Sequence, residues 1–416
     1  MIFFTVTQNI NIKLTDKSLV KYVVNKKNIE EKYNTTYCST YDDFETMKTV
    51  FKSVGESYQT KIIQEKKIKA LKDFPKPLGI VSNNEYYFRT KQKDYVDFYL
   101  DQQFVDINTQ LNTNKKDITI AIIGSLSSTI GQMICGATAL RILYKTLQNK
   151  FRTVKIDLYI NASQNQYYSR DKEIFKNYNF INSILPLGIS VKKLCTYDFY
   201  IDMGSFNETT YAQEFNFTDA YLYKFGIDYK RIPNNQKYNE INLGTYKPKQ
   251  ELKDAIQDAK LKSKLLLFHP YSSVLYRSMP SDLSKNMLQE LILKAKDYMV
   301  VTALNIEKVK DDNYLNLFKY SKNYSDFVYI ISQMDAIITV DTATYHISDA
   351  FAIPTVVIFT NIDPDKRIKY YIQTKAIKIE DKTKNLSNFI YENDTLSLYQ
   401  YEGWKELKVK KILTTI

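Results

Sequence analysis

The regular alternation of short apolar runs with helical segments after residue 117 constrains the fold most. The run 118–123 has the length of a buried strand and ends at Gly124, where a polar loop and a helical pattern follow. The same order restarts at residue 265 after a polar stretch. Strands that alternate with helices form parallel sheets covered on both faces. The sequence therefore predicts two consecutive α/β units. Strands are predicted at 118–123, 153–160, 184–187, 198–202, 265–268, 299–304, 336–340 and 355–359, and helices at 130–147, 171–180, 281–298, 327–334 and 342–351.

The first 115 residues have a different pattern. They suggest a strand at 10–14, a hairpin at 80–89 and an amphipathic helix over Tyr41–Val54, without a repeating strand–helix unit. A polar, turn-rich stretch follows at 108–117. We therefore expect an accessory α+β domain at 1–115, a first α/β domain at 116–245 and a second at 246–416.

Composition excludes several classes of protein. The chain has three cysteines, two histidines and a formal net charge of +12. No Cys or His pair has zinc-site spacing, so no metal is expected, and the cysteines are expected to be buried small side chains. No apolar run is long enough to span a bilayer, and no leader peptide is evident, which predicts a cytoplasmic protein. The charge suits an anionic partner, such as a nucleotide, a phosphorylated glycan or a membrane surface.

The most informative stretch is IITVDTATYHISDAFAIPTVVIF. A buried strand ends at Asp341, and Thr342 is placed to cap a helix whose first turn exposes the amides of Ala343 and Thr344. Unpaired amides and the helix dipole make such a turn an anion site. His346 lies on the same short helix. The alternative is that Asp341 only caps the helix and His346 is an ordinary buried side chain.

A second loop, FHPYSSVLYRSMP, also follows a predicted strand. Ser272 and Ser273 supply hydroxyls, and Arg277 supplies a cation that can neutralise a departing diphosphate. By itself this loop is more typical of a helix cap. A third loop, GSLSSTIGQMICG, lacks both the GxGxxG and the GK[ST] patterns, which disfavours ATP or NAD binding by those routes.

Together these stretches resemble glycosyltransferase family 9, the ADP-heptose:lipopolysaccharide heptosyltransferases. DTATYH, followed by AFAIPTVVIF and IDPD, is similar to the family's DTGxxH block; YDFYIDMG looks like its YDxxID strand, and IGQ stands where the family has IGD. The resemblance covers about residues 118–369. It implies a GT-B fold: two facing Rossmann-like domains, here with an additional N-terminal α+β domain.

The long N-terminal segment makes the layout similar to bacterial autotransporter heptosyltransferases, which glycosylate Ser on adhesins. Those relatives carry a cysteine cluster that binds iron near the C-terminus. No cysteine follows Cys195 here, so the resemblance does not extend to that metal site.

The resemblance also implies roles for individual residues. Asp341 would bind the sugar hydroxyls, the turn after it would hold the donor phosphates, and Arg277 would complete the grip on the diphosphate. His346 would support this loop, and Glu307 would accept from the nucleotide ribose. The implied donor-binding residues are Ser272, Ser273, Arg277, Glu307, Asp341, Thr342, Ala343, Thr344 and His346.

The implied catalytic residues are Gln132, Asp341, Arg277 and Asp202. The family's IGD aspartate is the expected general base, but Gln132 replaces it here, and a neutral amide takes no proton at pH 7. Three explanations stay open: Asp202 or Asp341 substitutes as the base, the acceptor chemistry differs, or the protein binds without turnover.

The expected activity is therefore that of an inverting glycosyltransferase without a metal or other cofactor. The donor would be a nucleotide-diphosphate heptose or related sugar, with ADP-heptose as the first candidate. The acceptor would be an adhesin-like protein or lipopolysaccharide, with peripheral association at the inner membrane and a homo-oligomer as further expectations. The alternatives are a non-catalytic GT-B-like binding or assembly protein and, on charge alone, a nucleic-acid-binding protein, which we do not expect.

Overall fold

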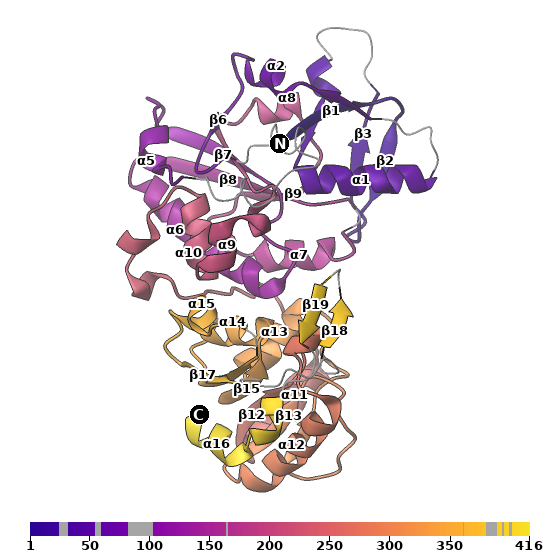
Figure 1. The fold of residues 1–416 in the computed structure, drawn as a ribbon, viewed down its shortest axis with the longest axis vertical. Helices are drawn as coiled ribbons and strands as arrows, with labels where there is room; N and C mark the ends of the chain where they lie inside the picture. Colours follow the sequence, from indigo (N-terminus) through magenta and orange to yellow (C-terminus); the bar gives the residue numbers. More distant parts are fainter. Residues whose placement is uncertain are drawn as a thin grey trace. The chain divides into compact units, whose positions relative to one another are not determined.

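The computed structural model describes residues 1–24, 32–54, 60–81, 103–163, 165–360, 362–379, 389–392, 395–398 and 402–416. These residues form two compact units, Met1–Gln236 (unit 1) and Lys237–Ile416 (unit 2) (Figure 1). Most of the hairpin expected at 80–89 lies outside the described residues. No described helix is both long and apolar enough to cross a bilayer.

Unit 1 contains a parallel sheet with the strand order β6-β11-β7-β8-β9. Its strands are β6 (Lys76–Pro77), β7 (Asp117–Ile123), β8 (Thr153–Ile160), β9 (Ser183–Pro186) and β11 (Phe199–Asp202). From β7 the chain continues to β8 on one side and later reaches β11 on the other. The strand order thus reverses between β7 and β11, and ligands of open α/β sheets bind beyond the carboxyl ends of the strands at such a switch point.

The helices of unit 1 are short except for α6 and α1. They are α1 (Tyr41–Val54), α2 (Glu65–Lys69), α5 (Ile107–Gln110), α6 (Ile130–Gln148), α7 (Tyr168–Phe175), α8 (Val191–Leu194), α9 (Thr210–Glu214) and α10 (Phe217–Lys224), with 3₁₀ turns at Lys32–Asn34, Phe206–Glu208 (η2), Tyr229–Arg231 and Asn234–Gln236. In α6 almost every residue from Met133 to Leu143 is buried, because the helix packs against both the sheet and α10.

The N-terminal segment forms a second, antiparallel sheet. Its order is β10-β4-β1-β5, from β1 (Ile2–Val6), β4 (Tyr37–Ser39), β5 (Thr60–Ile63) and β10 (Ile189–Ser190), beside a hairpin of β2 (Ile10–Lys13) and β3 (Leu19–Tyr22). Phe3 and Cys38 share one hydrophobic core with Ala121, Ile123 and Tyr200 of the parallel sheet. The N-terminal segment therefore packs on the first α/β sheet within unit 1, and β10 from that α/β region completes its sheet.

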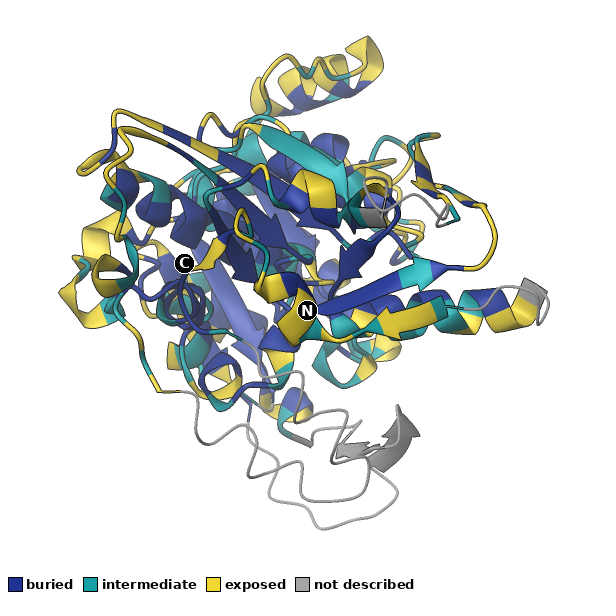
Figure 2. Cartoon of the chain, turned by 90° about the horizontal axis from the view of Figure 1, so that it is seen from above, coloured by how far each residue is buried: buried dark blue, intermediate teal, exposed yellow. Residues whose placement is uncertain are grey.

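Unit 2 contains a six-stranded parallel sheet, β14-β13-β12-β15-β16-β17, with its switch point between β12 and β15. The strands are β12 (Lys264–His269), β13 (Tyr298–Thr302), β14 (Tyr314–Asn316), β15 (Ala336–Val340), β16 (Thr355–Phe359) and β17 (Thr374–Lys378), with a separate pair β18 (Phe389–Glu392) and β19 (Thr395–Leu398). The helices are α11 (Gln250–Lys260), α12 (Ser281–Lys294), α13 (Tyr324–Ser332), α14 (Ala343–Ala350), α15 (Asp365–Ile368) and α16 (Val409–Thr415), with 3₁₀ turns at Leu275–Arg277 (η5) and Glu402–Glu406. The central strands β12, β15 and β16 are buried along almost their whole length. Figure 2 colours the described residues by burial and shows dark blue, buried strands and helix faces beside yellow, exposed ones.

The expected fold class is confirmed: both units are built on a parallel α/β sheet, as in GT-B proteins, with antiparallel sheet added at the N-terminus. Some boundaries differ from prediction. Helix α12 ends at Lys294, because Tyr298 already pairs with Lys264 in the sheet. Helix α13 begins at Tyr324, because the Asn323 side chain accepts from Asp326 N–H and caps it. The cysteines are buried or half-buried thiols, as expected.

Candidate functional sites at the two strand edges

The carboxyl edge of the unit 2 sheet brings Arg277 to Asp341. Asp341 directly follows β15, and Arg277 ends η5 in the loop that follows β12, on the other side of the switch point. Arg277 Nη1 lies 3.4 Å from Asp341 Oδ2, and Tyr345 donates to Asp341 Oδ1 at 2.9 Å. Burial lowers the pKa of Arg277, but Asp341, Tyr276 and Tyr345 together outweigh burial and raise this pKa above its usual value, so the guanidinium is charged.

Several buried polar atoms at this edge have no hydrogen-bond partner among the described residues. They are Asp341 Oδ2, Arg277 Nε, Thr344 Oγ1 and His269 Nδ1. Thr342 is the N-cap of α14, but its side chain makes no capping hydrogen bond to the first amides of this helix. Buried polar groups are nearly always paired, so this concentration is typical of a site that a polar ligand completes.

The loop after β12 is held in shape by Ser278. Its Oγ accepts from Ser272 N at 2.9 Å and donates to the carbonyl oxygens of Ser272 and Val274. Ser272 Oγ accepts from Val274 N, whereas Ser273 is exposed. The loop therefore positions Arg277 firmly and leaves one hydroxyl, that of Ser273, turned to solvent.

His346 is a buried residue of α14. It is 2% exposed, and its Nδ1 lies 2.6 Å from Tyr371 Oη. Burial and the nearby Arg367 keep its pKa well below the usual range, so the ring is neutral. Asn239 donates to Tyr371 Oη as well, at 2.8 Å. These contacts fit a supporting role for His346.

Glu307 is less closely tied to this edge. It lies in the loop after β13, the neighbour of β12, and its Oε2 accepts from Gln289 Nε2 at 3.0 Å. Ala343 is half-buried in the first turn of α14 beside Thr342. The structure thus brings most of the implied donor residues to one strand edge.

Unit 1 has a pocket of about 290 Å³ at the equivalent edge of its own sheet. We call it the unit 1 pocket. It is lined by Thr40, Asp42, Gly124, Ser125, Ser127, Ser128, Asn161, Ser163, Asn165, Tyr167, Arg170, Asp171, Met203, Gly204, Ser205, Phe206, Asn207 and Glu208. Apart from Thr40, which links β4 to α1, these residues follow β7, β8 and β11 or belong to α1, α7 and η2, so the pocket spans the switch point.

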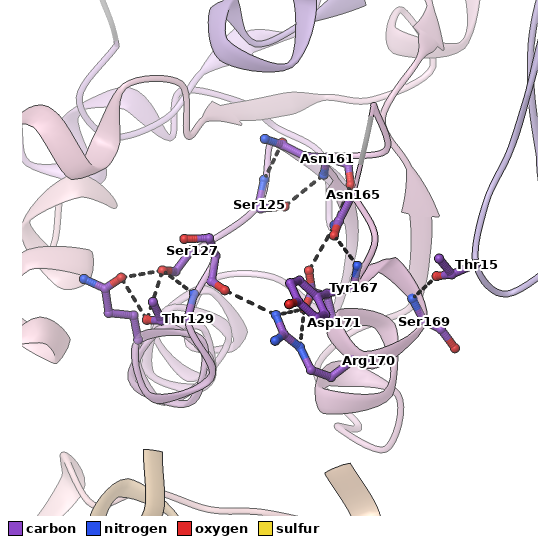
Figure 3. Close-up of polar contacts among 12 residues, drawn as sticks. Thr15, Ser125, Ser127, Thr129, Asn161, Asn165, Tyr167, Ser169, Arg170 and Asp171 are labelled. Carbon is purple, nitrogen blue, oxygen red and sulfur yellow. Dashed lines mark hydrogen bonds and ion pairs between the residues drawn. The ribbon is translucent and has the colours of Figure 1, made fainter. Parts of the chain in front are cut away.

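Hydrogen bonds fix the walls of the unit 1 pocket (Figure 3). Asn161 Oδ1 accepts from Ser125 N at 3.0 Å, and Ser125 Oγ accepts from Asn161 N at 2.9 Å, which ties the end of β7 to that of β8. Gly124 has a φ of 106°, and a Cβ there would meet Thr40 Cγ2 at 2.6 Å. Only glycine lets the chain turn into the pocket at this point.

The guanidinium in the unit 1 pocket is already engaged. Arg170 donates from Nε and Nη2 to Asp171 Oδ1, at 2.9 and 2.6 Å, and stacks 4.3 Å from the centre of the Tyr167 ring. Asn165 Nδ2 donates to the other oxygen of Asp171 (Figure 3). The positive charge of Arg170 is therefore neutralised locally.

Gln132 lies in the first turn of α6, next to the unit 1 pocket. Its Oε1 accepts hydrogen bonds from Ser127 Oγ and from Thr129 Oγ1, the latter at 3.2 Å. Ser127 itself lines the pocket. Gln132 is held in place as a hydrogen-bond acceptor, and an amide cannot take the proton of an attacking hydroxyl.

Asp202 is the last residue of β11 and does not line the unit 1 pocket. It is 2% exposed, and its Oδ2 forms a 2.9 Å ion pair with the amino group of Met1. Burial opposes ionisation, but this amino group and Lys224 outweigh it and lower the pKa of Asp202. A carboxylate that is buried, paired and held ionised fits a structural role better than that of a base.

Sequence reasoning missed Asp42 and Glu208. Asp42 is at the start of α1, Glu208 ends η2, and both line the unit 1 pocket. Asp42 as a whole is exposed, but desolvation of its carboxyl group by the surrounding protein atoms and the Glu208 carboxylate raise its pKa to about 6, against a Ser205 backbone hydrogen bond that lowers it. In the sequence, Asp42 and Asp43 have the pattern of ordinary acidic residues in the first turn of a helix. Only the fold shows that Asp42 and Glu208 line the same pocket.

The described residues contain no group of three His, Cys, Asp or Glu side chains placed to hold a metal ion. Comparison with known proteins gives one family match: residues 321–394, which include Asp341 to His346, match glycosyltransferase family 9 (heptosyltransferase). This match confirms the resemblance drawn from the sequence. No curated protein sequence matches the chain.

Several solved structures are similar at low identity. ADP-heptose lipopolysaccharide heptosyltransferase II of Escherichia coli matches at 14% identity and a TM-score of 0.48, over 72% of this chain and 97% of that one. A family 9 glycosyltransferase of Veillonella parvula gives 13% and 0.47, over 73% and 97%. The iron-containing dodecameric glycosyltransferase TibC of enterotoxigenic E. coli gives 13% and 0.41, over 63% and 65%.

Proposed function

We propose that this protein is an inverting glycosyltransferase that transfers a heptose or a related sugar from a nucleotide-diphosphate donor to a hydroxyl group. The observation that carries the proposal is the edge of the unit 2 sheet, where Arg277, Asp341 and Thr344 present buried polar atoms that make no hydrogen bond within the described residues, beside the start of α14. The family match across residues 321–394 includes two of these three residues and supports it.

The donor edge combines the two features that a diphosphate leaving group requires. Arg277 supplies a fixed positive charge, and the first amides of α14 supply oriented N–H donors. As the sugar leaves, negative charge grows on the diphosphate oxygens, and preorganised donors stabilise that charge most in the transition state. Asp341, whose Oδ2 accepts no hydrogen bond within the described residues, would accept one from a sugar hydroxyl and so orient the anomeric carbon.

The unit 1 pocket is the proposed acceptor site. It lies beyond the carboxyl ends of β7, β8 and β11 and is lined by hydroxyl and amide groups that suit a hydroxyl-bearing molecule. The acceptor oxygen would attack the anomeric carbon, and the bond to the diphosphate would break with its electron pair leaving on oxygen. A bacterial glycan and an adhesin-like protein are the acceptor classes proposed here. Homo-oligomer formation and peripheral membrane association stay predictions.

A second function, a non-catalytic binding or assembly protein, is favoured by one observation. Gln132 is held by Ser127 and Thr129 at the position where the family has its expected base. Such a protein would bind the nucleotide sugar and neither transfer nor hydrolyse it.

Titration calorimetry with ADP-heptose and a transfer assay with radiolabelled donor separate these functions. We expect the wild-type chain to bind ADP-heptose and to transfer the label to a glycan or adhesin acceptor. Asp341→Ala should lose both, whereas Asp335→Ala, placed before β15 at the opposite edge of the same sheet, should keep the donor affinity. Binding without transfer favours the second function, and absence of donor binding by the wild type contradicts both.

A further inference from the structure

The charges that line the unit 1 pocket are unlike those at the donor edge. The pocket has one cation, Arg170, and three carboxylates, Asp42, Asp171 and Glu208. Asp171 already holds Arg170, at 2.6 Å from Nη2. The lining as a whole therefore carries more carboxylates than cations. A phosphate group that entered would meet more negative than positive charge, which is unfavourable.

The rest of the lining suits an uncharged sugar. Three asparagines, Asn161, Asn165 and Asn207, and a series of hydroxyls provide both donors and acceptors. Tyr167 and Phe206 line the same pocket and can cover the apolar faces of a sugar ring. The donors and acceptors that line the pocket are numerous. They therefore match the many hydroxyl groups of a saccharide better than the single hydroxyl group of a Ser or Thr side chain.

One carboxylate in this pocket is positioned to accept a proton. Asp42 lies at the start of α1, and α1 is anchored through the next residue: Asp43 accepts from Ala162 N, Ser163 N and Ser163 Oγ in the loop after β8. The anchor fixes Asp42 at the wall of the unit 1 pocket. Glu208 is its acidic neighbour, and the pKa of about 6 leaves Asp42 mostly ionised at pH 7 yet more basic than an ordinary aspartate.

We propose, resting on the function proposed above, that the unit 1 pocket binds an uncharged saccharide acceptor and that Asp42 removes the proton from its attacking hydroxyl. The acceptor O–H bond breaks as the proton moves to an Asp42 carboxylate oxygen. The acceptor oxygen forms its bond to the anomeric carbon, and the nucleoside diphosphate departs with the electrons of the broken C–O bond. Gln132, through its contact with Ser127, positions the wall of the pocket and takes no proton.

The experiment uses the full chain, labelled ADP-heptose and three acceptors: a dephosphorylated core oligosaccharide, the same oligosaccharide with its phosphates, and a Ser/Thr-rich adhesin peptide. We expect transfer to the dephosphorylated saccharide above both others. Asp42→Asn should lower kcat at least about 100-fold, the lower end of the usual contribution of a general base. The calorimetric Kd for ADP-heptose should stay within about twofold, because the donor edge belongs to the other unit.

Two further variants protect the result from a folding artefact. Glu45→Gln, on the same helix, removes a carboxylate that pairs only with Lys48 in the described structure, and should leave transfer unchanged. Glu208→Gln removes the acidic neighbour of Asp42 and should move the acid limb of the pH–rate profile to lower pH without abolishing transfer. A merely structural role of Asp42 would give no such shift.

Three results would overturn the proposal. They are an Asp42→Asn variant with more than about a third of wild-type kcat, a preference for the phosphorylated saccharide or the peptide, and donor binding by the wild type without transfer to any of the three acceptors. The last leaves the donor site intact, whereas failure of the wild type to bind ADP-heptose would instead contradict the proposed function itself.

Discussion

The two sheets of this protein place the same kind of edge in different electrostatic surroundings. In unit 1 the switch point between β7 and β11 is surrounded by hydroxyls, amides and the carboxylates Asp42 and Glu208. In unit 2 the switch point between β12 and β15 carries Arg277 and the uncapped start of α14. The topology sets where a ligand binds, and the loop residues decide its charge. The proposed pairing of an uncharged acceptor with an anionic donor rests on that difference.

The largest effect should come from removing the cation at the unit 2 edge. Arg277→Ala should lower transfer at least about 100-fold, because the departing diphosphate loses a fixed positive charge. Its affinity for ADP should fall as well, measured by calorimetry. Arg152→Ala is the matched control, since Arg152 pairs with Asp117 on the exposed, opposite edge of the unit 1 sheet.

Removal of Arg277 also leaves Asp341 without its ion pair, so the thermal midpoint of each variant must be recorded. Arg277→Lys keeps the charge and should recover part of the activity. An Arg277→Ala variant that is folded and fully active would show that the two edges do not differ in the way we describe.

A second effect should separate the units by stability. Asp43→Asn replaces a buried acceptor of backbone and hydroxyl donors in unit 1 and should lower the free energy of unfolding by about 2 kcal/mol. Trp404, the only tryptophan, is buried in the core of unit 2. We expect far-UV circular dichroism to show the destabilised transition while Trp404 fluorescence keeps its midpoint.

Asp258→Asn, an exposed change on α11, should shift neither signal. If the Asp43→Asn variant moves both probes together, the two units unfold as one and the comparison between them loses its thermodynamic basis.

A third effect should appear in the pH dependence of kcat/KM. Asp42 must be ionised to take a proton, and its pKa is about 6, so the rate should fall about tenfold per pH unit below that value and level off above it. The charged groups around it are Glu208 from η2, Asp202 from β11 and Asp43 on α1, with Arg170 and Asp171 across the pocket. A profile that stays flat between pH 5 and 7.5 would contradict the assignment.

The smallest effect is expected at Gln132. Gln132→Ala removes an acceptor for Ser127 and Thr129 but no proton-transfer group, so kcat should fall less than about tenfold. The kcat of Gln132→Ala should be measured by steady-state kinetics in the same experiment as that of Asp42→Asn, so that the two variants are compared directly. A loss at Gln132 as large as that at Asp42 would place the essential chemistry at the first turn of α6 instead.

The sequence predicted the unit 2 edge better than the unit 1 pocket for a physical reason. Asp341 and the first turn of α14 are adjacent in the chain, so strand, cap and helix start appear as one local pattern. Arg277 was predicted from a second short loop, which follows β12, the neighbour of β15 in the sheet. Asp42 and Glu208 belong to separate elements, and only the packing of α1 against the loop after β8 brings Asp42 to the pocket. Long-range packing of this kind leaves no periodic signal.

The absence of a sequence signal for long-range packing also explains why strand β10 was not predicted. The apolar runs 336–340 and 355–359 became strands at the predicted positions, because strands buried on both faces are uniformly apolar. β10 has only two residues, Ile189 and Ser190, and its neighbour β4 lies near the N-terminus. Nothing in so short a segment indicates that it closes a sheet begun far earlier in the chain.

That pairing has a consequence for biosynthesis. When β1, β4 and β5 have emerged from the ribosome, one edge of β4 has no partner strand. The strand that pairs with this edge, β10, is synthesised about 150 residues later. An unpaired strand edge is a template for association with other nascent chains. The first quarter of this protein therefore depends on the translation of the next quarter, and a chain cut after residue 115 should be captured by chaperones or aggregate.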